Sequence, residues 1–215
     1  MKRRFALLAP FLAIAMGAAQ AQEPAPATAP VDEPQTTLVA IDTTMGTITV
    51  ALETERAPIT ANNFLRYADE HRLDGTVFYR VMRLDWGEQP NGLIQGGARW
   101  DPERILPSIA HEPTSETGVH HTAGTISMAR GEPGTANADF SILLSDLEGL
   151  DADPTSEDPD LKAGYAAFGH VVSGMEVARA IFDAPIDPEE GEGFLKGQMI
   201  ADPITILSVR RMAGE

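Results

Sequence analysis

The stretch TLVAIDTTMGTITVAL, residues 37–52, begins the globular part of the sequence and indicates the kind of fold to expect. Apolar and polar residues alternate on both sides of Thr44-Met45-Gly46, which is the pattern of two strands joined by a tight turn. Glycine supplies the permissive backbone that such a turn needs. The stretch therefore predicts a β-hairpin.

One helix is expected directly after the hairpin, and a second one late in the chain. Pro58 stands where a helix can begin, and apolar residues recur at i, i+3, i+4 and i+7 from Ala61 onward. Further on, Ser173 and Glu176 have the spacing of a capping box, with an apolar stripe behind them. Both segments predict amphipathic helices that bury one face.

Further short runs with strand character are each bounded by Gly, Pro, Asp or Asn: residues 76–82, 93–95, 125–128, 140–144, 166–172 and 204–210. Two helices cannot cover both faces of a sheet with about eight strands, so a closed barrel buries the apolar faces better. We therefore predict a mainly β fold, a closed eight-stranded antiparallel barrel capped by two α-helices.

The sequence before the hairpin has the features of an export leader. Residues 1–21 combine a basic start, an apolar run and Ala19-Gln20-Ala21, which is the pattern of a cleaved signal peptide. Pro10 interrupts the run, which is shorter than the roughly 20 apolar residues of a membrane helix. Residues 22–36 are rich in Pro and Ala and predict a linker, so the domain is expected over residues 37–212. We expect an exported, periplasmic protein.

Composition excludes several classes of partner. The chain has no cysteine, so we expect no disulfide to stabilise it. Its net charge of −16 becomes about −19 after the leader, because the leader carries three of the 16 basic residues and none of the 32 acidic ones. Such a charge repels nucleic acid and anionic membranes. We therefore expect neither nucleic-acid binding nor membrane binding after signal cleavage, and a monomer.

Residues 78–97, FYRVMRLDWGEQPNGLIQGG, contain the first candidate site residues. The strand period places Phe78, Arg80 and Met82 on one face. Considered alone, Arg80 is an arginine that lays its stem along the barrel and pairs with a carboxylate, and Gln95 is an outward polar residue. Residue type alone therefore leaves their function open.

Four separated blocks of the sequence change that interpretation. They are FYRV, LIQGG, TAGTISMARGEPGTANADFSILL (residues 122–144) and YAAFGHVVSGMEV (residues 165–177). In this order they resemble the cyclophilins, the cyclosporin-type peptidyl-prolyl cis-trans isomerases, and especially the exported bacterial branch. The resemblance runs from Leu38 to Arg211 and implies the family's eight-stranded antiparallel barrel with two helices, which agrees with the fold predicted above.

The resemblance also implies an activity and a site. Arg80 matches the family's catalytic arginine and Gln95 its substrate-positioning glutamine, with proline-containing or unfolded polypeptides as substrates and no cofactor. We therefore expect a peptidyl-prolyl cis-trans isomerase that assists the folding of exported proteins. The remaining candidate substrate-binding residues are Leu93, Met128, Ala129, Asp139, Ser141, Leu150, Tyr165 and Trp86.

The match departs from the family pattern in the proline pocket. Gly92 and Ser141 stand where the family has phenylalanines, so the site is expected to be partly divergent. Trp86 lies in an insertion and either folds back as a replacement wall or leaves the proline pocket without one, in which case weak or altered proline binding is expected. Asp139 either pairs with Arg80 and diverts it from substrate, or merely orients it. The alternative function is a non-catalytic polypeptide-binding or scaffold protein whose proline pocket has decayed.

Metal sites are not expected. His120 and His121 are adjacent, and adjacent residues on a strand point apart, with no third ligand at a suitable spacing. The acidic segment 146–164 lacks the central glycine of an EF-hand and contains two prolines. We interpret it, and the similar segment 183–197, as solvated loops.

Overall fold

The computed structural model describes residues 34–99 and 101–213. The predicted signal peptide, residues 1–21, and most of the predicted linker, residues 22–36, lie outside the described residues. No helix in the described ranges is long and apolar enough to cross a membrane.

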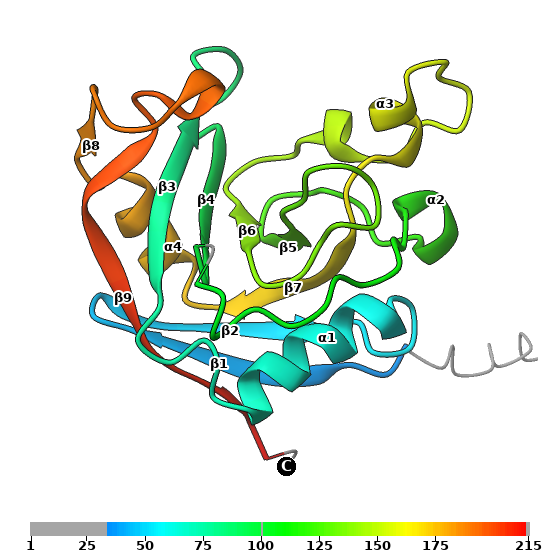
Figure 1. Ribbon diagram of the computed structural model, residues 1–215, viewed down its shortest axis with the longest axis horizontal. Helices are drawn as coiled ribbons and strands as arrows, with labels where there is room; N and C mark the ends of the chain where they lie inside the picture. The colour runs from blue at the N-terminus through cyan, green and yellow to red at the C-terminus, as the bar shows by residue number, and fades with distance from the viewer. Residues whose placement is uncertain (1–33, 100, 214–215) are drawn as a thin grey trace, which may run out of the picture. The chain divides into compact units, whose positions relative to one another are not determined.

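Antiparallel strands form one closed sheet in the described part of the chain (Figure 1). Around the ring the order is β1-β2-β7-β5-β6-β4-β3-β9, and β1 pairs with β9 to close it. The two-residue strand β8 pairs with β9 outside this ring, so the predicted eight-stranded barrel is confirmed. The strands are β1 (Thr37–Thr43), β2 (Gly46–Leu52), β3 (Val77–Arg83), β4 (Gly92–Gly97), β5 (Thr125–Met128), β6 (Phe140–Leu143), β7 (Ala167–Ser173), β8 (Ile186–Asp187) and β9 (Met199–Arg211).

The closure of the ring places the start of β1 next to the end of β9. β1 and β9 pair from Val39 opposite Arg211 to Thr43 opposite Ile206. Beyond this register the backbone N–H of Met212 donates to the carbonyl oxygen of Leu38 at 2.9 Å. The first and last strands therefore leave the barrel side by side.

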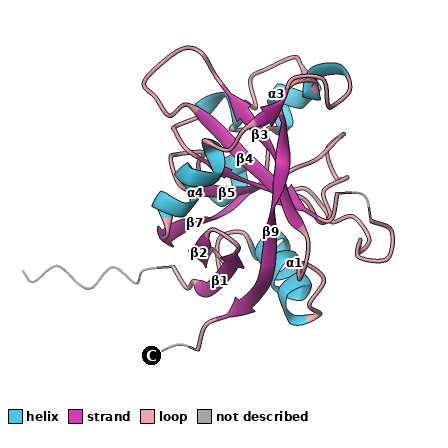
Figure 2. Cartoon of the chain, turned by 90° about the vertical axis from the view of Figure 1, so that its left-hand side faces the viewer, coloured by secondary structure: helices cyan, strands magenta, loops and turns pink. Residues whose placement is uncertain are grey.

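Two main helices cover the barrel, α1 (Pro58–Asp69) and α4 (Met175–Phe182), and they lie on opposite sides of β9 in Figure 2. Pro58 begins α1 as predicted. The predicted capping box is wrong, because Ser173 ends β7 and Gly174, in the left-handed region with φ 89°, precedes α4 without a side-chain cap. The shorter helices are α2 (Thr114–Thr117), α3 (Pro159–Ala163), η1 (Glu148–Leu150) and η2 (Gly193–Leu195).

Aromatic rings fill the barrel beneath α1. Phe64 of α1 meets Phe140 of β6 edge-on with 5.2 Å between ring centroids, and Phe78 meets Phe140 at 5.6 Å. All three side chains are buried. This geometry is favourable for aromatic pairs and joins the helix to the inner surface of the strands.

A bulge in β3 changes which side chains face outward. Phe78 pairs with Gly96 and Arg80 pairs with Gln95, so Tyr79 is an extra residue without a partner on β4. The prediction that Phe78 and Arg80 share one face is therefore wrong. Phe78 lies in the core, while Tyr79 and Arg80 both border the same hollow on the outer side.

Gly92 does not occupy the place of a missing aromatic wall. It begins β4 with φ +140°, and a Cβ at this position would collide with the carbonyl oxygen of Met82. The backbone path at the end of the 84–91 insertion thus excludes a side chain at residue 92. A phenylalanine side chain could not be accommodated here.

We predict that Gly92→Ala lowers the free energy of unfolding by about 2–4 kcal/mol, because the new methyl group meets backbone and the residue is held at positive φ. Urea unfolding measures the change. Gly149→Ala is the control, since nothing lies within 4 Å of its Cβ position, and it should change stability by less than about 0.5 kcal/mol. Equal effects of the two substitutions would contradict the prediction.

Candidate active site

A hollow of about 560 Å³ opens beside β3, β4, β5 and β6. Strand alternation creates it, since Ile94 and Ile142 point into the core while Gln95 and Ser141 point outward. Nine of the ten predicted site residues border this hollow. They are Arg80, Leu93, Gln95, Met128, Ala129, Asp139, Ser141, Leu150 and Tyr165.

Arg80 is held by two amide oxygens. Its Nη1 donates to Oε1 of Gln95 at 2.7 Å, and its Nε donates to Oε1 of Gln198 at 2.9 Å. Among the described residues, none accepts a hydrogen bond from Nη2. Burial lowers the pKa of Arg80, and nearby Tyr79 and Tyr165 oppose that shift. The guanidinium stays charged at neutral pH and presents one free amino group to the hollow.

Gln95 is oriented by a chain of hydrogen bonds that ends at Asp139. Its Nε2 donates to the Tyr79 hydroxyl at 2.7 Å, and that hydroxyl donates to Oδ2 of Asp139 at 3.1 Å. The other carboxylate oxygen accepts from the backbone N–H of Arg99 at 3.0 Å. Asp139 thus reaches Arg80 only through Tyr79 and Gln95, which favours the orienting role over diversion of the guanidinium.

Burial is the main influence on the pKa values of Asp139 and Tyr79 in this series of hydrogen bonds. Desolvation raises the pKa of Asp139, and hydrogen bonds from Arg99 and Tyr79 oppose the rise. Burial, followed by the charge of Asp139, raises the pKa of Tyr79 far above its usual value. Tyr79 is therefore a neutral hydrogen-bond donor at neutral pH.

Apolar side chains form one wall of the hollow. Met82, Leu93 and Leu150 pack together at the edge of the barrel, next to the buried Leu143 and Leu147. Met82, Leu93 and Leu150 reach the hollow from β3, β4 and η1, respectively. Flexible methionine and leucine side chains therefore form this apolar wall.

The C-terminal end of the acidic segment 146–164 is attached to Arg130, which borders the hollow. Arg130 donates to the carbonyl oxygen of Gly164 at 2.7 Å and pairs with Asp160 at 3.0 Å. Its guanidinium carbon lies 4.6 Å from the ring centroid of Tyr165. This end of the segment is thus fixed to the site, whereas we expected a solvated loop throughout.

Trp86 does not supply a wall, which corrects the prediction. Its side chain is 61% exposed and borders a separate hollow of about 400 Å³, together with Pro90 and Asp146. The insertion is closed on itself, because Asn91 Nδ2 donates to the carbonyl oxygen of Trp86 at 2.6 Å. This internal bond turns the loop away from Arg80.

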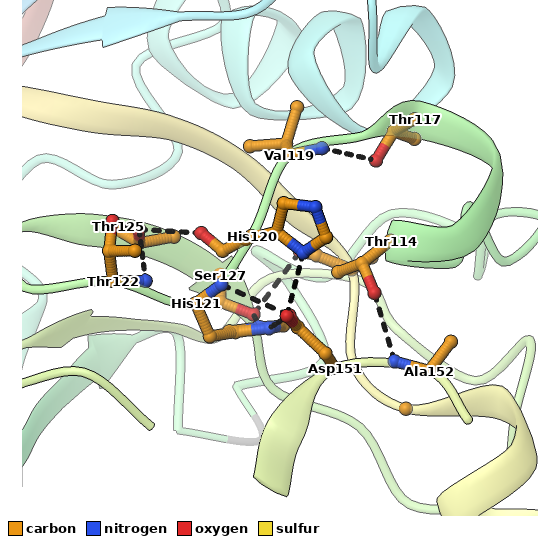
Figure 3. Close-up of polar contacts among 12 residues, drawn as sticks. Thr114, Thr117, Val119, His120, His121, Thr122, Thr125, Ser127, Asp151 and Ala152 are labelled. Atoms are coloured by element: carbon orange, nitrogen blue, oxygen red, sulfur yellow. Dashed lines mark hydrogen bonds and ion pairs between the residues drawn. The ribbon is translucent and has the colours of Figure 1, made fainter. Parts of the chain in front are cut away.

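His120 and His121 converge on one carboxylate, as Figure 3 shows. Nδ1 of His121 lies 2.6 Å from Oδ1 of Asp151, Nδ1 of His120 lies 2.7 Å from Oδ2, and Nε2 of His121 lies 2.8 Å from the Ser127 hydroxyl. Both residues precede β5, so the expectation that they point apart on a strand is wrong. The cluster links Asp151, the residue after Leu150, through His121 to Ser127, and both Leu150 and Ser127 border the hollow.

Burial governs the titration of this histidine cluster. Desolvation lowers the pKa of His121, although its bond with Asp151 opposes the shift. Burial raises the pKa of Asp151, but the hydrogen bonds from both histidines outweigh it and leave that pKa below its usual value. Within the described ranges, no group of three or more His, Asp or Glu side chains is arranged to hold a metal.

The sequence did not reveal Tyr79, Gln198 and Phe194 as site residues. Tyr79 reaches the hollow because of the bulge, which has no local sequence signal. Gln198 and Phe194 come from the connection between β8 and β9, more than 110 residues beyond Arg80, with Gln198 118 residues away. Only the tertiary pairing of β3 with β9 brings them to the site.

Comparisons with known proteins agree with the geometry. Residues 38–211 match the family described as cyclophilin type peptidyl-prolyl cis-trans isomerase/CLD. A peptidyl-prolyl cis-trans isomerase of Acinetobacter baylyi is 35% identical, with 69% of this chain and 73% of that protein covered. A peptidyl-prolyl cis-trans isomerase-like 1 of Neurospora crassa is 36% identical, with coverages of 71% and 85%.

Solved structures share the fold. The crystal structure of a cyclophilin-type peptidyl-prolyl cis-trans isomerase of Cryptosporidium parvum matches with a TM-score of 0.63 at 21% identity, covering 84% of this chain and all of that one. The same protein solved in the presence of the dipeptide Ala-Pro matches with a TM-score of 0.62 at 22% identity, with coverages of 82% and 99%.

We predict that Asp139→Asn changes how stability depends on pH. The raised pKa means that Asp139 favours folding when protonated, below its ordinary value of 3.8, and that this contribution is lost as the pH rises through the folded-state pKa. The free energy of unfolding of Asp139→Asn, relative to the wild type, should therefore increase from pH 4 toward pH 7.

Urea unfolding at several pH values measures this difference. Asp85→Asn, at an exposed position, controls for the general effect of removing one negative charge. A relative stability of Asp139→Asn that falls as the pH rises would refute the assignment.

Proposed function

Since this chain belongs to the family of cyclophilin-type peptidyl-prolyl cis-trans isomerases, we propose that it accelerates the isomerisation of X-Pro bonds in unfolded or flexible polypeptides, and that these are exported proteins. The observation that carries the proposal is the position of the Arg80 guanidinium at the edge of a hollow with apolar walls. Hydrogen bonds hold its Nε and Nη1, and no described residue accepts a hydrogen bond from its Nη2.

The reaction needs neither a nucleophile nor a base. Conjugation of the amide nitrogen with the carbonyl creates a barrier of about 18–20 kcal/mol to rotation. Before proline the two isomers are close in energy, so slow interconversion limits folding. A catalyst therefore has only to stabilise the twisted amide more than either planar form.

Arg80 is suited to that stabilisation. When the amide twists, the proline nitrogen becomes pyramidal and gains a lone pair that accepts a hydrogen bond, and the free Nη2 can donate to it. Because this bond exists only in the twisted state, it lowers the barrier rather than merely binding substrate. The hydrogen bonds to Gln95 and Gln198 hold the donor in place before substrate arrives.

Gln95 holds the carbonyl side of the substrate in this proposal. One hydrogen of its Nε2 is used by Tyr79, and the second is available to a peptide oxygen. The hollow, at about 560 Å³, has the size of a small-ligand site and accommodates a proline ring with its neighbours. A related fold solved with Ala-Pro is consistent with a proline-containing ligand.

The alternative is a polypeptide-binding or scaffold protein without catalysis. Ser141 favours this alternative, because it leaves the hollow without an aromatic wall on β6. Each lost aromatic wall would cost about 1.5–3 kcal/mol of burial. The intact arrangement of Arg80, Gln95 and Asp139 favours the enzyme, since a binding surface has no need of a preoriented donor.

We further infer that the protein belongs to the exported bacterial branch and acts as a monomer in the periplasm. The sequence of residues 1–21 supports export, and the blocks HTAGTISMAR and YAAFGHVVSGMEV support the branch. The net negative charge of the chain repels nucleic acid, which is consistent with polypeptide substrates.

We predict that Arg80→Ala reduces isomerisation of an Ala-Pro peptide by about 10²–10³-fold, because the transition-state donor is removed. NMR exchange spectroscopy measures both the rate and peptide binding. Arg66→Ala, at an exposed ion pair on α1, serves as the matched control and should retain full activity. Binding of the peptide by the wild type without acceleration would support the scaffold alternative.

A second prediction concerns export. Cleavage after Ala21 gives a mature chain that begins at Gln22. Expression of residues 1–215 in a Gram-negative bacterium, followed by fractionation and mass spectrometry, should find this chain in the periplasm. A variant in which Lys2, Arg3 and Arg4 are replaced by Asp should be retained with its leader intact. Retention of the wild-type leader would refute the proposal.

A further inference from the structure

The loop between β8 and β9, residues 188–198, borders the hollow and contains none of the predicted site residues. Phe194 and Leu195 of this loop line the hollow together with Met199, the first residue of β9. In Figure 1 the loop is the orange segment next to β3. We propose that Phe194 is a substrate-binding wall and that Gln198 is a positioning residue for Arg80, an inference that rests on the proposed isomerase function.

Gln198 fixes Arg80 and Phe194 at the same time. Its Oε1 accepts from Nε of Arg80 at 2.9 Å, and its Nε2 donates to the carbonyl oxygen of Phe194 at 2.8 Å. Both ends of the amide are thus used, so its orientation is determined. Gln95 accepts a hydrogen bond from Nη1 of Arg80, and Gln198 accepts one from Nε. Two acceptors on the same guanidinium prevent its plane from rotating, so that Nη2 stays directed at substrate.

Phe194 supplies the aromatic surface that Ser141 lacks. Its ring centroid lies 5.7 Å from the guanidinium carbon of Arg80, and its side chain is 78% exposed. A phenylalanine this exposed beside an apolar hollow loses water when a ligand covers it, which favours binding. The wall is therefore provided from β9's side of the hollow rather than from β6.

The loop is fastened to the site at a second point. Glu190 pairs with Arg99 at 2.8 Å, and the backbone N–H of Arg99 donates to Asp139. Within the loop, the N–H of Gly197 donates to the carbonyl oxygen of Glu190 at 2.9 Å. The loop thus spans the site from the Asp139 side to Arg80, which holds Phe194 over the hollow.

Steady-state isomerisation of an Ala-Pro peptide, measured by NMR, separates the two roles. Phe194→Ala should raise KM about five- to tenfold and change kcat by less than about threefold, since it removes contact area from bound substrate. Gln198→Leu should lower kcat about tenfold and leave KM within about twofold, since it loosens the donor. Leu207→Ala, an exposed position on β9, is the control and should match the wild type.

Gln198→Glu distinguishes positioning from a merely structural role. Its carboxylate still accepts from Nε of Arg80 but cannot donate to Phe194, so kcat should return to within about threefold of the wild type. The ¹⁵N signal of the Arg80 Nε–H should be slow to exchange in the wild type and Gln198→Glu, and fast in Gln198→Leu. An unchanged kcat or an unchanged Nε–H exchange rate in Gln198→Leu would overturn the role of Gln198.

Failure of the isomerase function gives a different result. If the wild type does not accelerate exchange, the proposed function and the positioning role fail together. Peptide titration followed by chemical shifts still tests Phe194, since the wall requires Phe194→Ala to weaken peptide binding about five- to tenfold. Equal peptide affinities of Phe194→Ala and the wild type would overturn the role of Phe194 as a substrate-binding wall, whether or not the protein is an isomerase.

Discussion

One extra residue in β3 determines how this site is built. Because the bulge leaves Tyr79 without a partner on β4, Tyr79 and Arg80 face the hollow in succession while Phe78 and Val81 remain in the core. In a regular strand, Tyr79 and Arg80 would point to opposite faces. The hydroxyl that connects Gln95 to Asp139 would then be absent, and Gln95 would keep only Arg80 as a partner for its amide.

Alternate side chains of a barrel strand point inward to the core, which stabilises the fold, and outward to the hollow, where substrate would bind. Phe140 and Ile142 of β6 pack inside, and Ser141 between them faces the hollow. Substitutions on the outer face therefore leave the core unaltered, which explains how a chain keeps the fold while its pocket changes. Here Ser141 borders the hollow together with Met82, Met199 and Phe194.

The sequence predicts what is local or periodic, and misses what depends on long-range pairing. The hairpin, α1 and the strands around Arg80 and Gln95 follow from alternation, and the family resemblance names nine residues that do meet at the hollow. Trp86 was misplaced because the course of an irregular insertion has no period. The Ser173 capping box failed because β7 extends to that residue. Phe194 and Gln198 were missed because they lie in the irregular connection between β8 and β9, which reaches the site only through the pairing of β3 with β9.

The adjacency of the barrel's first and last strands has a consequence for protein engineering. Since the N–H of Met212 bonds to the carbonyl of Leu38, the described domain enters and leaves through neighbouring points. A few residues would suffice to join these points, so new ends could be opened at a surface turn elsewhere. The whole barrel could also be inserted into a loop of a host protein. The two ends of the interrupted host loop would then need to lie about as far apart as adjacent strands of a sheet.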